Sequence, residues 1–139
     1  MSSDAADRIH SAAIHLIRRV REVDEWMDIT PRRASALSVL VFGGPRTLTE
    51  LAHAEQVTTA TMSRLVTAME EDGLVRREPH ADDARALRLV PTAKARRILE
   101  RGRARRTEFL DSLFADLSAG EREIVRQAAE LVDRAVLPV

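Results

Sequence analysis

Cysteine is missing from this chain of 139 residues, and its absence excludes several kinds of chemistry. Without thiols the protein can form no disulfide, hold no metal through thiolate ligands and sense no oxidant through a reactive cysteine. A cysteine-free chain also fits a reducing compartment. Any signal that this protein senses must therefore reach it by another route.

Long apolar segments are missing too. No run approaches the roughly 18 apolar residues that a membrane-spanning helix needs. The N-terminal sequence MSSDAADRIH lacks the basic and apolar regions of a signal peptide. We therefore expect neither export nor membrane insertion, and we expect the protein to be cytoplasmic.

The sequence also lacks the patterns that mark catalytic or metal sites. Its four histidines are scattered, with no His-x-x-x-His pair and no acidic residues at metal-ligand spacing. Its five glycines form no phosphate-binding loop, and there is no Gly-x-Ser-x-Gly nucleophile elbow. We therefore predict that the protein is not an enzyme and has no catalytic residue, no metal and no cofactor.

The most informative segment that is present is a short helix predicted from about Thr58 to Glu71. Apolar residues recur there at the three- and four-residue spacing of one helical face, which must pack on a core: Met62, Leu65, Val66 and Met69. The other face and the N-terminal end carry small, hydroxyl-bearing and basic side chains that can approach a DNA groove closely. These candidate DNA-binding residues are Thr58, Thr59, Ala60, Thr61, Ser63, Arg64 and Thr67.

A second short helix is predicted just before this one. Residues 47–50 (TLTE) have the capping-box pattern that starts a helix, which should run to about Ala54. Residues 55–57 (EQV) then have the length of the connection in a helix-turn-helix motif. Thr58 caps the helix that follows. The two helices together are a candidate helix-turn-helix.

A β-hairpin is predicted after the second helix. Asp72-Gly73 supplies the left-handed residue that ends a helix, and Leu74 to Arg77 alternates as a strand. A polar tip from Glu78 to Asp83 follows, and residues 85–90 (RALRLV) form the returning strand, with Leu87 and Leu89 on one side. Two strands and a charged tip are typical of a wing. Its candidate DNA-binding residues include Arg76, Arg77 and Arg85.

Together these segments resemble the MarR family of bacterial transcription regulators, most strongly from Thr47 to Ala95. The matching motifs are Glu50-Leu51-Ala52, Val57-Thr58, Thr61-Met62-Ser63-Arg64-Leu65-Val66, Met69-Glu70, Gly73-Leu74-Val75 and Arg77. Asp83-Ala84-Arg85 is similar to the family's Asp-x-Arg motif at the wing tip, which implies that Arg85 enters a minor groove and that Asp83 steadies it. Residues 91–95 (PTAKA) depart from the family's Leu-Thr-x-x-Gly, although Thr92 can still cap the next helix.

The rest of the chain is predicted to be helical. Amphipathic helices are expected from about Asp4 to Trp26, from Thr30-Pro31 to Gly43-Gly44, from Thr92 to Leu113, and from the capping box at residues 118–121 (SAGE) onward. The first and last helices would leave apolar stripes exposed on a monomer, which indicates an interface with a second copy. The resemblance implies the same homodimer.

The expected architecture is mainly α with a small β-hairpin wing (α+β). It is a winged helix-turn-helix whose terminal helices form a dimerisation domain. We expect a single MarR-type domain over residues 1–139. Within it, residues 30–91 would be the DNA-binding lobe, and residues 1–27 with 92–139 would be the helical dimerisation region.

The formal net charge is zero, but a neutral total does not exclude a basic stripe on the DNA-facing side. We predict a sequence-specific transcription regulator, a repressor, that binds an inverted-repeat operator in double-stranded DNA as a homodimer. The resemblance implies a small aromatic or phenolic effector, for which His15, Trp26, Ser35 and Val39 are candidate contacts. Two alternatives stay open, namely a winged-helix module that binds protein and a DNA-binding protein without an effector.

Overall fold

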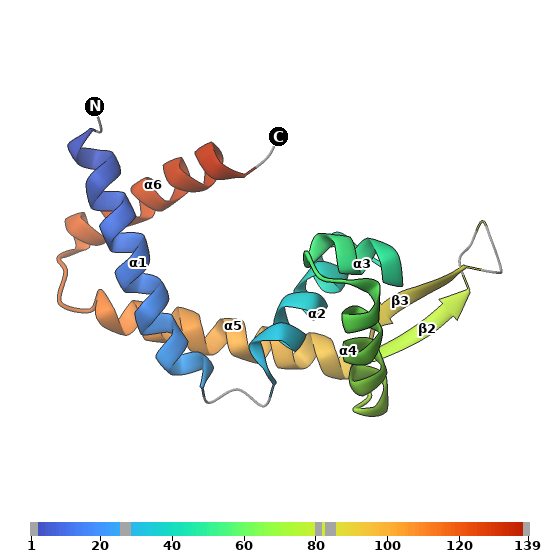
Figure 1. The fold of residues 1–139 in the computed structure, drawn as a ribbon. Coiled ribbons are helices and arrows are strands. Elements are labelled where there is room, and N and C mark those ends of the chain that lie inside the picture. The colour runs from blue at the N-terminus through green and yellow to red at the C-terminus, as the bar shows by residue number, and fades with distance from the viewer. Residues whose placement is uncertain (1–2, 26–28, 80–81, 83–85, 138–139) are drawn as a thin grey trace.

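The computed structural model describes residues 3–25, 29–79, 82 and 86–137, and its elements gather at the two ends of one long helix. In chain order they are α1 (Asp4–Asp24), α2 (Pro31–Gly43), β1 (Arg46–Thr47), α3 (Leu48–Ala54), α4 (Thr59–Glu71), β2 (Val75–Pro79), β3 (Leu87–Pro91), α5 (Ala93–Leu113) and α6 (Ala119–Val136). Figure 1 shows α5 joining a lobe, built of α2, α3, α4 and the strands, to an arm that contains α1 and α6. This is the mainly helical winged helix-turn-helix that the sequence predicts.

Hydroxyl side chains fix the starts of the helices in the described chain. All six helices begin after a serine or threonine whose side-chain oxygen accepts the backbone N–H three residues later. The predicted capping box at 118–121 is complete, since Glu121 N donates to Ser118 Oγ at 3.2 Å and Ser118 N donates to Glu121 Oε2 at 2.8 Å. At 47–50, Glu50 N donates to Thr47 Oγ1 at 3.2 Å. These caps explain why the predicted starts agree with the structure.

Three antiparallel strands form the wing sheet, in the order β1-β3-β2. β2 and β3 pair from Val75 opposite Pro91 to Pro79 opposite Leu87. The sequence predicted a two-stranded hairpin, and the short β1, which pairs Arg46 with Leu89, adds a third strand to it. β2 also runs two residues beyond Arg77, so the strand takes in part of the predicted polar tip.

The hydrophobic core lies entirely in the lobe and the adjoining start of α5. Its largest fully buried side chains come from α2, α3, α4, β2 and β3: Leu37, Leu40, Leu51, Met62, Val66, Met69, Val75 and Leu89. Ala95 and Leu99 extend it onto α5. On β3, Leu89 is buried while Leu87 is 46% exposed. Leu87 lies at the end of β3 toward the hairpin tip, and the hairpin projects beyond the rest of the lobe there (Figure 1).

Two similar turns close the ends of α3 and α4. After α3, Gln56 adopts a left-handed φ of 56°, and Val57 N donates to Ala52 O at 3.0 Å. After α4, Gly73 has a φ of 71°, and Leu74 N donates to Met69 O at 2.8 Å. Both have the hydrogen-bond pattern of a Schellman motif, in which a left-handed residue reverses the chain. The sequence predicts the left-handed turn at Gly73, whereas nothing in it marks a left-handed turn at Gln56.

The arm helices pack very little within one chain. Neither α1 nor α6 has a buried residue. A half-buried ion pair between Arg106 Nη1 and Asp24 Oδ1, 3.0 Å apart, ties the end of α1 to α5. The guanidinium of Arg19 also lies over the ring of Phe109, 5.6 Å from its centroid. These polar contacts hold α1 on α5 but leave most of its apolar stripe in solvent.

Candidate nucleic-acid interface

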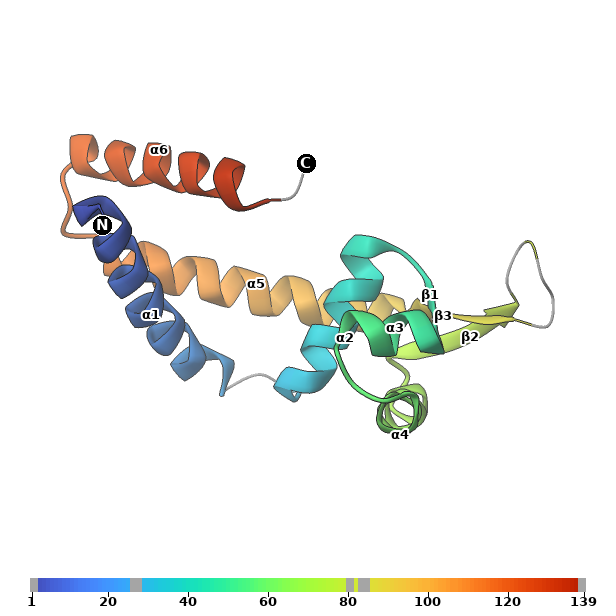
Figure 2. The same ribbon diagram turned by 45° about the horizontal axis from the view of Figure 1, so that its top comes forward.

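Helix α4 presents one face to the core and the other to solvent. Met62, Val66 and Met69 are buried, and Leu65 packs against them from a partly buried position. The residues opposite this stripe are exposed, among them Ala60, Arg64 and Thr67. Figure 2 shows α4 nearly end-on, at the lower edge of the lobe in that view. The exposed face of α4 is therefore free to enter a groove of another molecule.

Hydroxyl groups on α4 divide into those used by the helix and those that point elsewhere. Thr58 Oγ1 accepts Thr61 N at 3.1 Å and donates to Thr61 Oγ1 at 3.0 Å. Thr67 Oγ1 donates to Ser63 O at 2.9 Å. Thr59 makes no side-chain hydrogen bond with the residues described here. Thr58 is thus mainly a cap, while Thr59 and Thr61 still have a hydroxyl proton to donate outward.

Arg64 is the exposed cation at the centre of this face. It makes no ion pair with any described residue. Its side chain lines a shallow hollow of about 510 Å³ together with Val57, Leu65 and Ala68, with Arg32 of α2 and Glu55 of the α3–α4 turn. A guanidinium without a protein partner keeps all its donors for guanine or phosphate acceptors.

The predicted basic residues of β2 are both paired with carboxylates. Arg77 Nε lies 3.4 Å from Glu70 Oε2 of α4, and Arg76 Nε lies 2.8 Å from Glu78 Oε1 on the same strand. Arg77 stands opposite the buried Leu89 in the sheet register, so it lies on the sheet face that packs toward the core. In the structure Arg76 and Arg77 are thus each paired with a carboxylate, whereas Arg64 makes no ion pair with a described residue.

Other predicted site residues are spread over the chain. Asp83, Arg85 and Trp26 lie outside the described residues. Ser35 and Val39 lie one turn apart on α2, where Ser35 Oγ donates to Glu55 Oε1 at 2.9 Å and Val39 packs against the core. His15 is exposed on α1. The hollow beside Arg64 is not lined by Ser35, Val39 or His15.

The C-terminal end of α4 is fixed by contacts that sequence reasoning missed. Asp72 forms an ion pair with Arg33 of α2, and Lys94 Nζ donates to Asp72 O at 2.8 Å. Thr92 Oγ1 donates to Gly73 O at 2.6 Å. Each contact joins residues at least 19 positions apart, and no local spacing signals such pairs. The start of α2 and the start of α5 together hold the end of α4.

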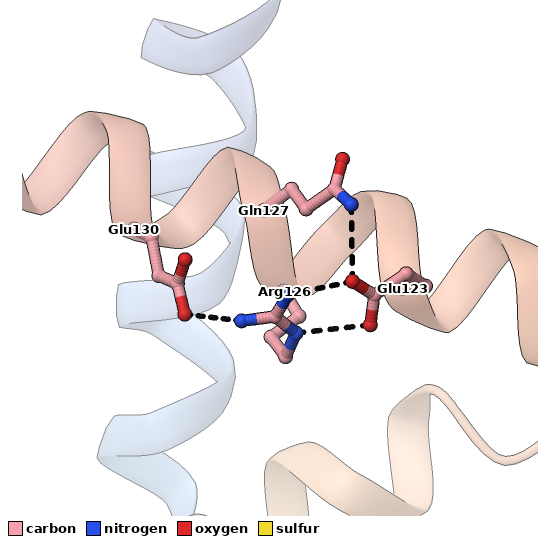
Figure 3. A network of polar contacts seen from close by, with 4 residues as sticks. All are labelled: Glu123, Arg126, Gln127 and Glu130. Carbon is pink, nitrogen blue, oxygen red and sulfur yellow. Dashed lines mark hydrogen bonds and ion pairs between the residues drawn. The ribbon is translucent and has the colours of Figure 1, made fainter.

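Helix α6 carries a compact polar network on one face, shown in Figure 3. Arg126 pairs with Glu123 and Glu130, and Gln127 Nε2 donates to Glu123 Oε1 at 3.0 Å. Hydrogen bonds from Arg126 and Gln127 lower the pKa of Glu123 to about 2. Hydrogen bonds from Ser118 lower the pKa of Glu121 below its ordinary value.

An adjoining face of α6 is apolar. At about 100° per residue, Ile124 and Leu131 project roughly a quarter turn from the centre of the Arg126 network. They are 65% and 56% exposed, and on α1 Ile9 and Ile17 are 49% and 53% exposed. Contiguous apolar stripes of this kind are typical of surfaces that a partner covers.

The described residues contain neither a candidate membrane span nor a candidate metal cluster. No helix among them combines the length and the apolar character that crossing a bilayer requires. Histidine and acidic side chains in the same part of the chain form no group of three or more that could hold a metal ion.

Comparison with known proteins gives one consistent family. Residues 27–86 match the model of the MarR family. An HTH-type transcriptional regulator of Mycobacterium tuberculosis is 30% identical over 134 residues, which cover 95% of this chain and 94% of the relative. A transcriptional regulator of Thermotoga maritima has a similar structure, with a TM-score of 0.82 and 26% identity over 96% of this chain and 94% of that one. A MepR mutant from S. aureus, solved with a bound oligodeoxyribonucleotide, shares the fold at a TM-score of 0.71 and 20% identity, over 98% of this chain and all of that one (100%).

Proposed function

The chain belongs to the MarR family of helix-turn-helix transcriptional regulators, and on that premise we propose that it binds an inverted-repeat operator in double-stranded DNA as a homodimer. The family consists of regulators and not of enzymes. The observation that carries the proposal is the exposed Arg64 on the outer face of α4, which makes no ion pair with a described residue and lies beside hydroxyl groups at the start of that helix. A MepR mutant of the same fold has been solved with DNA.

We assign α4 to the major groove. Its contacts would come from the side chains on its exposed face and N-terminal end: Thr58, Thr59, Ala60, Thr61, Ser63, Arg64 and Thr67. Arg64 supplies a planar donor fork that matches the O6 and N7 acceptors of guanine. Arg76 and Arg77 would need to exchange their carboxylate partners for phosphates. The wing-tip residues Asp83 and Arg85 remain assigned to the minor groove through the family resemblance.

We propose that the arm together with α5 is the dimerisation region. Residues 1–27 and 92–139 would pair with the same segments of a second copy, leaving residues 30–91 as the DNA-binding lobe of a single domain. The exposed apolar stripes of α1 and α6 support this assignment. Burying apolar surface stabilises an association by roughly 25 cal/mol for each Å² removed from water. Sedimentation tests it. We expect a dimer at low micromolar concentration, and a monomer at tens of micromolar would refute the assignment.

We further propose that the protein is a cytoplasmic repressor whose DNA affinity falls when a small aromatic or phenolic anion binds. The candidate contacts are His15, Trp26, Ser35 and Val39. Ser35 is the most informative of them, because its hydrogen bond to Glu55 links α2 to the turn before α4. Titrating the protein–DNA complex with phenolic carboxylates tests this proposal. Release of DNA by wild type, with a weaker response in Ser35→Ala, is expected, and no release by any of them would contradict it.

The DNA-binding proposal itself is tested by sequencing genomic fragments that the purified protein retains. Enrichment of one inverted-repeat motif is expected, and sites beside its own gene would support a repressor. Retention of fragments without any shared motif would contradict sequence-specific binding.

A further inference from the structure

Two neighbouring arginines at the start of α2 have different surroundings. Arg33 is held by Asp72 at the end of α4. Arg32 is exposed and makes no ion pair with a described residue, yet its side chain lines the same hollow as Arg64 and Thr61 of α4. The one carboxylate in that hollow, Glu55, accepts the Ser35 hydroxyl at 2.9 Å. Arg32 therefore adds, beside the exposed face of α4, a second guanidinium that makes no ion pair with a described residue.

The position of Arg32 relative to α4 is set by helical geometry. At about 100° per residue, Glu70 projects to one flank of α4, where it meets Arg77 of the wing. Thr61, Leu65 and Ala68 project to the other flank and line the hollow with Arg32. The wing and Arg32 consequently lie on opposite flanks of the same helix.

A helix seated in the major groove has a phosphate strand on each side. The groove is about 12 Å wide, so elements that flank the helix face its two walls. If α4 enters the groove, the wing meets one wall and Arg32 meets the other. Phosphate contacts of this kind fix the register of a protein on DNA and carry little sequence information themselves.

We propose that Arg32 binds a backbone phosphate of the operator, on the strand that borders the major groove on the side away from the wing. The inference rests on the proposed DNA-binding function and extends its contact surface beyond the helix-turn-helix and the wing. Arg64, on the same hollow, would approach the base edges or the neighbouring phosphate. The hollow thus accommodates one strand of the duplex backbone.

The test uses the intact protein and a duplex selected from a random pool by the wild-type protein. Each phosphate contact contributes a slope of about −0.9 to the dependence of log affinity on log salt, so losing one contact per half-site changes the slope of a dimer by about 1.8. The affinity defect of Arg32→Ala should therefore shrink about 12-fold between 50 and 200 mM salt. Arg32→Lys should retain most of the slope, because the charge is kept.

A second measurement locates the contact. Single uncharged methylphosphonates are placed along the selected duplex, one position at a time. Wild type should lose affinity at one position beyond the α4 contacts in each half-site, and Arg32→Ala should be insensitive at that position only. A wild-type slope in Arg32→Ala, or unchanged sensitivity at every phosphate, would overturn the proposal while DNA binding by wild type stands. Failure of wild type to select any duplex would instead refute the proposed function, and this inference with it.

Discussion

The hydroxyl of Thr92 donates a 2.6 Å hydrogen bond to the carbonyl oxygen of Gly73. The same hydroxyl accepts Ala95 N at 3.2 Å and so caps α5, while Thr92 N donates to Leu74 O at 3.0 Å. One residue thereby joins the turn that ends α4 to the start of the helix that reaches the arm. We therefore expect the orientation of α5 to be coupled to that of α4 through this residue.

Replacing Thr92 by alanine should destabilise the lobe. Loss of a threonine N-cap costs about 1 kcal/mol, and here the bond to Gly73 is lost as well. Denaturant unfolding measures the change. Thr107→Ala is the control, because Thr107 lies within α5 and alanine is a better helix former than threonine. A Thr92→Ala protein as stable as Thr107→Ala would show that the hydrogen bonds of Thr92 contribute nothing to the free energy of unfolding.

The two left-handed turns around α4 should respond to substitution in opposite directions. Gln56 has a φ of 56°, a region that favours glycine, so Gln56→Gly should stabilise the protein by roughly 0.5–1 kcal/mol. A methyl group on Gly73 would meet open space, but the φ there is 71°, so Gly73→Ala should cost about 1 kcal/mol through backbone conformation alone. Thermal unfolding of both variants checks the pair. Shifts of the same sign would refute the assignment of both turns.

Acid should weaken the polar network of α6 through Glu123. Its pKa in the folded protein is about 2, below the ordinary value of 4.5, so its contribution to stability is complete above about pH 4.5. The contribution is lost as the pH falls toward 2, because the folded state then binds the proton that the unfolded state already holds. Carboxyl NMR titration measures the pKa directly.

Arg126→Ala is the matched variant for that titration. Arg126 is the main cause of the lowered value, so its removal should move the pKa of Glu123 toward 4.5. An unchanged titration in this variant would show that the network of Figure 3 does not persist in solution.

Arg64 and Arg85 should affect DNA binding differently. Arg64→Ala should cost about 1 to 3 kcal/mol and relax the preference at one base position of each half-site. Arg85→Ala should weaken binding to all sequences more evenly, with some loss of preference for A·T-rich flanks and a salt slope lower by about one unit per half-site. Affinities on matched and scrambled operators at several salt concentrations distinguish the two. If Arg85→Ala bound both operators with the affinity and salt slope of wild type, the assignment of Asp83 and Arg85 to the DNA interface would be refuted.

Local signals account for the parts of the fold that could be predicted. Thr58 and Ser118 were recognisable as caps because capping depends on residues three positions apart, and the stripe on α4 was recognisable because helical spacing is regular. Gly73 is recognisable as a helix stop because glycine readily adopts the left-handed φ that ends a helix. Gln56 occupies the equivalent position after α3 and carries no such signal, since glutamine rarely adopts a left-handed φ.

Long-range pairing limited the prediction of the site. Basic character alone groups Arg76 and Arg77 with Arg64, but Arg77 pairs with Glu70 of α4 and Arg76 with Glu78, and the pairing of Arg77 depends on how β2 packs beside α4. The ion pair between Arg33 and Asp72 joins residues 39 positions apart, and no local spacing in the sequence signals it. No sequence signal marks Arg32, because only its shared hollow with Arg64 distinguishes it from other exposed arginines.

The central claim is that two copies of α4 read one inverted repeat, and hydroxyl-radical footprinting on the selected operator tests it most directly. Twofold symmetry predicts two equivalent protected half-sites whose centres lie about 10 bp apart, or a multiple of that spacing, on one face of the duplex. The protection should be symmetric and should appear in both halves at the same protein concentration. Protection of a single asymmetric half-site at full affinity would contradict the account.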